Sequence, residues 1–163
     1  MSYTDVLNSS SGKNKKELKN LILSQDNTTT INLSVEESGS LVLLRNCGGT
    51  KLINLPPASS NTGVYYDFYL HEALSAHTTT IQSKDGTDYI VGVIADGEQA
   101  TTEQYPFAVG STYDQLVVAA SAAADEFECR MICDGDNWVL MNAISQDISD
   151  ITGATSSSNT RTV

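Results

Sequence analysis

The chain has 163 residues, of which 40% are hydrophobic and 18% are charged, and its formal net charge is −11. This length fits one domain with a hydrophobic core, and the apolar content excludes a wholly disordered chain. The acidic excess argues against nucleic acid as a partner, and the sequence contains no apolar stretch long enough to span a membrane as a helix.

The first expected element is a short helix at residues 13–23, because Leu18, Leu21 and Ile22 follow the i, i+3 and i+4 spacing of one helix face. Residues 1–19 hold four lysines and two acidic residues, whereas the rest of the chain holds five basic and 18 acidic residues. We therefore expect an extended N-terminal arm over residues 1–27. Its lysines are either solvated or dock on an acidic partner. The candidate partner-binding residues are Lys13, Lys15, Lys16, Leu18, Lys19, Leu21 and Ile22.

Nine strand-like runs follow, each rich in β-branched or aromatic residues, and Gly, Asn, Asp or Pro punctuates most of the gaps. This pattern predicts an all-β domain over residues 28–145, either an antiparallel β-sandwich or a small jelly-roll-like barrel. The sequence TTTI occurs at residues 28–31 and again at 78–81, which is too short to establish a repeat. The runs are TTTINLSV, SLVLLRN, KLINL, VYYDFYL, TTTIQS, DYIVGVIAD, DQLVVAA, EFECRMICD and NWVLMNA.

The last segment, residues 146–163, is rich in Ser and Thr and is expected to be a C-terminal tail. The cysteines are Cys47, Cys129 and Cys133, and the last two lie four residues apart on one strand face, too far apart to bond. The first 12 residues are polar and do not resemble a secretory signal. Reduced thiols in a protein made in a cytosol are the expectation.

No catalytic constellation stands out in the sequence. His71 and His77 frame HEALSAH, but a zincin motif needs its second histidine at position 75, which is Ser75. The Asp134-Gly135-Asp136 turn resembles part of a calcium loop but lacks the final bidentate Glu. Phosphate loops, GxGxxG and GxSxG are absent from the sequence. We therefore predict a protein that is not an enzyme and needs neither metal nor cofactor.

An aromatic run is the clearest candidate for binding. In a strand, Tyr66 and Phe68 face one way while Tyr65 and Tyr69 face the other. One pair is expected to fill the core, and the other to line either a sugar-binding groove or a subunit interface. Tyr is enriched at such interfaces, so Tyr65 and Tyr69 are the candidate oligomer interface.

Three features occur in a fixed order between about residues 40 and 143. Ile53-Asn54-Leu55-Pro56 is followed by Gly63 and the aromatic strand; TTTIQSKDGTDYIVG spans residues 78–92; and DGDNWVL ends the series at residues 134–140, with the only Trp of the chain. This order resembles a β module of tailed-phage virion proteins, both capsid decoration (cement) proteins and tail-fibre or tail-tip proteins. Trp138 is expected to be buried.

The resemblance implies a non-enzymatic structural protein. The chain is short for a fibre and lacks long fibrous repeats, which favours a decoration protein on the outside of a phage head. The implied partner is the major capsid protein, the implied assembly is a homotrimer, and the implied location is the virion exterior. The alternative is a receptor-binding or carbohydrate-binding module of a phage tail.

Overall fold

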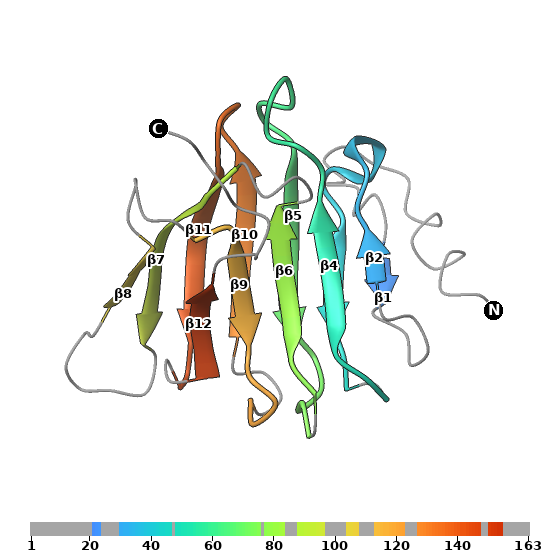
Figure 1. The fold of residues 1–163 in the computed structure, drawn as a ribbon, viewed down its shortest axis with the longest axis vertical. Coiled ribbons are helices and arrows are strands. Elements are labelled where there is room, and N and C mark those ends of the chain that lie inside the picture. The colour runs from blue at the N-terminus through green and yellow to red at the C-terminus, as the bar shows by residue number, and fades with distance from the viewer. Residues whose placement is uncertain are drawn as a thin grey trace, which may run out of the picture.

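The computed structural model describes residues 21–23, 30–46, 48–75, 77–83, 88–96, 104–107, 113–122, 127–147 and 150–154. Within these ranges the protein is built of strands, with one short 3-10 turn, η1 (Val35–Glu37). The strands form two sheets that lie face to face (Figure 1). The predicted all-β class is therefore confirmed. Among the described residues, no helix has the length and apolar character to cross a membrane.

One sheet has seven strands and the other has five. The seven-stranded sheet has the order β1 (Leu21–Leu23), β3 (Leu41–Leu44), β5 (Tyr65–Leu70), β10 (Phe127–Cys133), β11 (Trp138–Ser145), β7 (Ile90–Asp96) and β8 (Gln104–Phe107). The five-stranded sheet has the order β12 (Ile151–Ala154), β9 (Gln115–Val118), β6 (Thr79–Ser83), β4 (Lys51–Leu55) and β2 (Thr30–Asn32).

The chain alternates between the two sheets from β1 to β6. Each step crosses the core, so the next strand in the same sheet runs in the same direction as the last one. As a result β1, β3 and β5 are parallel neighbours, and so are β2, β4 and β6. Five of the ten strand pairings in the described residues are parallel, so the predicted antiparallel arrangement is wrong for half of them. The twelve described strands leave both sheets open, so they do not form a closed barrel.

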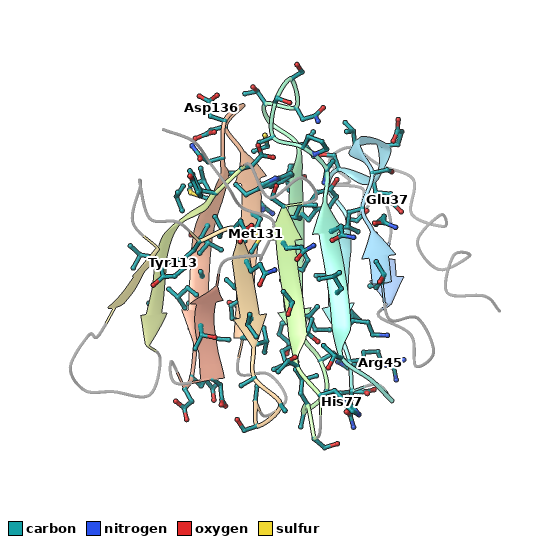
Figure 2. The ribbon with its side chains drawn as sticks, in the orientation of Figure 1. Glu37, Arg45, His77, Tyr113, Met131 and Asp136 are labelled. Carbon is teal, nitrogen blue, oxygen red and sulfur yellow. The ribbon has the colours of Figure 1, made fainter. Side chains whose placement is uncertain are left out.

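The hydrophobic core lies between the sheets and follows from the period-two pattern of the strands. Ile53 on β4, Ile81 on β6 and Leu116 on β9 share one register position, and all three are fully buried. The seven-stranded sheet contributes larger side chains, including Trp138 and Met131, and Figure 2 shows Met131 in the middle of the body. The predicted burial of Trp138 is confirmed.

Two expectations at the ends of the chain need correction. Leu21, Ile22 and Leu23 form strand β1, so the predicted helix does not reach these residues, and residues 13–20 lie outside the described part. Three consecutive apolar residues are compatible with both the helical and the strand periodicity. The segment is a strand because it pairs with β3. Residues 151–154, assigned from composition to the tail, form β12 and pair with β9.

Candidate interaction surface

The residues of the ordered motif between about residues 40 and 143 meet at one end of the two sheets. The indole Nε1 of Trp138 donates a hydrogen bond to the carbonyl oxygen of Pro56 at 3.2 Å, and its ring packs against Tyr66 with ring centroids 5.8 Å apart. The backbone N–H of Trp138 donates to the carbonyl of Tyr89 at 2.8 Å. The three sequence features are thus joined directly to one another.

The loop that follows Pro56 is held from the same side. The backbone N–H of Ala58 donates to a carboxylate oxygen of Asp88 at 2.7 Å, and the hydroxyl of Ser83 donates to the same oxygen at 3.1 Å. Gly63 has a φ of 87°, which favours glycine, and its N–H donates to the carbonyl of Cys133 at 2.8 Å. These motif residues therefore serve packing and loop anchoring.

The Asp134 turn is explained by its own hydrogen bonds. One carboxylate oxygen of Asp134 accepts from the backbone N–H groups of Asp136 at 2.8 Å and Asn137 at 2.7 Å. The bond from Asp136 is the main reason that the pKa of Asp134 lies below its usual value, because hydrogen bonds to a carboxylate favour its charged form. Among the described residues, no group of three His, Cys, Asp or Glu side chains is placed to hold a metal ion.

The two histidines lie far from this end of the molecule. Figure 2 shows His77 and Arg45 at one end of the body and Asp136 at the other. Between the histidines, Glu72 accepts a hydrogen bond from Nε of Arg45 at 2.8 Å, so its carboxylate is already engaged. Cys129 and Cys133 are buried free thiols on one face of β10, as predicted, and Cys47 lies outside the described residues.

Among the described residues, the outer face of the seven-stranded sheet carries most of the large apolar side chains that are exposed. This outer face comprises the residues of β1, β3, β5, β10, β11 and β7 that point away from the core. Leu21 is 51% exposed, Met141 47%, Val93 42% and Ile144 42%. Alternation along β11 and β7 puts the last three on this face, since their neighbours Leu140, Ala143 and Ile94 are buried. This face is therefore the candidate interaction surface.

The aromatic strand β5 contributes to the same face in the manner predicted. Tyr66 and Phe68 are buried in the core, whereas Tyr65 and Tyr69 are half-buried on the opposite side. The inward and outward alternation is therefore confirmed, and the interface role of Tyr65 and Tyr69 stays a prediction. Leu43 on β3 lies beside Tyr69 and extends the apolar area.

One charged pair lies in the middle of this apolar surface. Nε and an Nη nitrogen of Arg130 donate to the two carboxylate oxygens of Asp67 at 2.6 and 2.8 Å, across the β5–β10 pairing. The hydrogen bond that Arg130 donates to Asp67 is the main cause that raises the pKa of Arg130. The guanidinium also lies 4.7 Å from the ring centre of Tyr65. The pair is partly exposed to solvent, and its two hydrogen bonds hold the guanidinium and the carboxylate in place between apolar side chains.

A β-bulge shapes the surface next to this pair. Glu128 faces Ile144 and Arg130 faces Met141, so β11 carries one extra residue opposite Cys129. Asn142 lies in this bulge with a φ of 51°. An open hollow of about 500 Å³ lies here, and its lining includes Leu41, Asp67, Tyr69, Glu128, Arg130 and Asn142.

The predicted partner-binding residues divide into three groups. Leu21 lies exposed on the outer face, beside Leu41. Ile22 packs against the core, because adjacent residues of a strand point to opposite sides, so it is not part of the surface. Lys13, Lys15, Lys16, Leu18 and Lys19 lie outside the described residues.

Comparison with models of known protein families and with curated proteins gave no match. Sequence reasoning missed Met141 and Ile144 as surface residues, as well as the pair of Arg130 with Asp67. The sequence NWVLMNA predicts a regular alternation of inward and outward side chains. The bulge at Asn142 shifts this alternation by one residue, which places Ile144 on the outer face. The usable signal was the apolar outward residues of β5.

Proposed function

We propose that this protein is a non-enzymatic structural protein of a phage virion, a decoration protein that binds the outside of an assembled head as a homotrimer. The observation that carries the proposal is the exposed apolar outer face of the seven-stranded sheet, which includes Leu21, Tyr65, Tyr69, Met141 and Ile144. The ordered motif that resembles phage virion proteins supports the choice of partner. Its residues pack together, as a scaffold role requires.

Burial of this face contributes favourable free energy to association. Complete burial of one such side chain contributes about 1.5–3 kcal/mol, and side chains that are already half-covered contribute roughly half of that. Leu21, Met141 and Ile144 together then give about 3 kcal/mol per subunit before any polar contact. A trimer on a regular shell repeats each contact, so modest contacts suffice for firm attachment.

The lysines of the N-terminal arm steer the encounter in this proposal. They are the main basic group of a chain with a net charge of −11. Their attraction to an acidic shell is screened by salt, whereas apolar burial is not. Replacing the four lysines with Ala should slow capture and remove its salt dependence. Deletion of residues 1–24 is a poorer test, because it also removes strand β1.

The central experiment compares charge insertion on the two outer sheet faces. Met141→Glu and Ile144→Glu place a carboxylate on the apolar face, and Thr152→Glu is the matched control on exposed β12 of the other sheet. Light scattering at micromolar concentration measures oligomer size, and sedimentation with undecorated heads measures attachment. The proposal expects the first two variants to lose both and the control to retain both. Equal behaviour of all three would contradict it.

A carbohydrate-binding module of a phage tail is the second candidate. The hollow beside the Arg130–Asp67 pair favours it, because charged and amide groups next to Tyr69 suit sugar hydroxyls and a sugar face. Binding to immobilised glycans that Asn142→Ala and Tyr69→Ala abolish would favour this candidate. Co-purification of the protein with DNA-filled heads that lack tails would favour decoration.

A further inference from the structure

Four amide side chains form a ladder across the outer face of the five-stranded sheet. Gln115 donates to Gln82 at 2.8 Å, Gln82 donates to Asn54 at 2.9 Å, and Asn54 donates to Asn32 at 2.8 Å, in each case from the amide nitrogen to the amide oxygen. The four residues occupy one register position on β9, β6, β4 and β2. The three donating amides, those of Gln115, Gln82 and Asn54, each point an N–H group towards β2. The ladder therefore ends at Asn32, whose amide N–H has no acceptor among the described residues.

Strand β2, where the ladder ends, is an edge strand of its sheet in the described part of the chain (Figure 1). The N–H of Leu33 donates to the carbonyl of Asn54 at 2.9 Å. Because backbone groups of alternate residues point to opposite sides, those of Thr30 and Asn32 face away from β4. Ile31 on β2 and Ile22 on β1 are only partly buried against the core. This edge offers backbone groups, an amide donor and an incompletely covered core.

The three parallel strands of this sheet share a short sequence pattern. Each has Ile in the core position, followed directly by an amide on the outer face; the sequences are Thr30-Ile31-Asn32, Leu52-Ile53-Asn54 and Thr80-Ile81-Gln82. In the whole chain, Ile or Leu is followed directly by Asn or Gln at four places, and the fourth is Leu7-Asn8. The sequence Val6-Leu7-Asn8 thus carries the pattern of these strands.

The spacing of this fourth copy fits the winding of the chain. From Val6 to Thr30 is 24 residues, compared with 22 from Thr30 to Leu52 and 28 from Leu52 to Thr80. The crossing to the other sheet is of similar length: Val6 to Leu21 is 15 residues, compared with 11 from Thr30 to Leu41 and 15 from Leu52 to Asp67. A strand at residues 6–8 would therefore precede β1 in the same way that β4 precedes β5.

We propose that residues 6–8 of this same chain dock as a parallel strand on the free edge of β2. In this arrangement Asn8 accepts the hydrogen bond from the amide of Asn32 and extends the ladder, and Leu7 covers the core beside Ile31. Lys13, Lys15, Lys16 and Lys19 then lie in the crossing that leads to β1, so the basic group is displayed at one edge of an acidic body. This inference is independent of the proposed function.

Cysteine cross-linking of the full chain tests the register. Neighbouring strands lie about 4.8 Å apart, which is within the range of about 4.4–6.8 Å that a disulfide needs between its Cα atoms. In a Cys47→Ser background, Asn8→Cys with Asn32→Cys should form a disulfide within one chain under mild oxidation. Leu7→Cys with Asn32→Cys, whose side chains would point to opposite faces, should react at least about tenfold more slowly. Equal rates for both pairs, no disulfide for the first pair, or a disulfide between two chains would each overturn the proposal.

Hydrogen exchange provides a second measurement that needs no new bond. Leu7→Asp puts a charge at the core-facing position, whereas Val6→Thr keeps a strand-forming residue at the outer position. The backbone amides of Thr30 and Asn32 should exchange at least about tenfold faster in Leu7→Asp than in the wild type and should be unchanged in Val6→Thr. Unchanged protection in Leu7→Asp would show that residues 6–8 do not cover this edge.

Discussion

Replacement of Trp138 by Ala tests the packing of the motif residues most directly. The indole is fully buried, packs on Tyr66 and donates a hydrogen bond to Pro56. Its loss should cost about 3–5 kcal/mol through the cavity it leaves. The orphaned carbonyl of Pro56 adds about 1 kcal/mol if water does not reach it. Domains of this kind have a total stability of only about 5–15 kcal/mol, so the variant should be close to unfolding.

Urea unfolding followed by far-UV circular dichroism is the suitable assay, because Trp138 is the only Trp and its removal abolishes the intrinsic Trp signal. For a chain of this size the expected decrease in the thermal midpoint is about 6–20 °C. Trp138→Phe should retain part of the packing and lose about 1–3 kcal/mol. Met141→Ala, on the exposed side of the same strand, should change stability by less than about 0.5 kcal/mol. If Trp138→Ala were no more destabilising than Met141→Ala, the packing argument would be refuted.

Three further predictions concern backbone, charge and thiols. Gly92 has a φ of 134°, and a Cβ there would lie 2.7 Å from Cβ of Leu140. Gly92→Ala should therefore lower the free energy of unfolding, measured with denaturant, by at least about 1–3 kcal/mol. Gly49→Ala is the control and should be neutral, because a Cβ at Gly49 meets no atom within 4 Å. The folded pKa of Asp134 lies below its unfolded value of about 3.9, so its carboxylate stabilises the fold above that pH, and this contribution is lost as the pH falls through the folded pKa. Unfolding midpoints of Asp134→Asn should therefore decline less steeply than those of the wild type below about pH 4, and parallel curves would contradict the assignment. Burial raises the pKa of both Cys129 and Cys133, so in a Cys47→Ser background a thiol reagent at pH 8 should label the protein only after denaturation; rapid labelling of the native protein would disprove their burial.

The strands themselves were predictable, and their directions were not. KLINL and the aromatic run became β4 and β5 because inward and outward residues alternate with period two in both. That alternation is the same in parallel and antiparallel sheets, so it carried no information on the crossings that make β2, β4 and β6 parallel. The strand β12 was hidden in a polar segment, because only Ile151 in it is a large apolar residue.

The candidate surface could be predicted only where one strand carries it. Tyr65 and Tyr69 were placed on one face from their spacing alone. The pair of Arg130 with Asp67 joins residues 63 positions apart, and its prediction requires knowing that β10 pairs with β5. The motif residues behaved similarly, since their sequence order was visible but their meeting at one end was not.

The bond from Trp138 to Pro56 spans 82 positions of the chain, and this has a consequence for synthesis on the ribosome. Within strands β1 to β6, each strand pairs with one that lies two strands away along the chain, such as β1 with β3 and β2 with β4. This half of the protein can therefore become ordered while translation continues. The segment from Pro56 to Gly63 forms its hydrogen bonds with Asp88, Cys133 and Trp138 only as those residues emerge in turn. The last of them, Trp138, is synthesised 82 residues after Pro56. We therefore expect strands β1 to β6 to be ordered in a ribosome-bound fragment that ends at residue 122. The loop after Pro56 would become fixed only when β11, which carries Trp138, is complete.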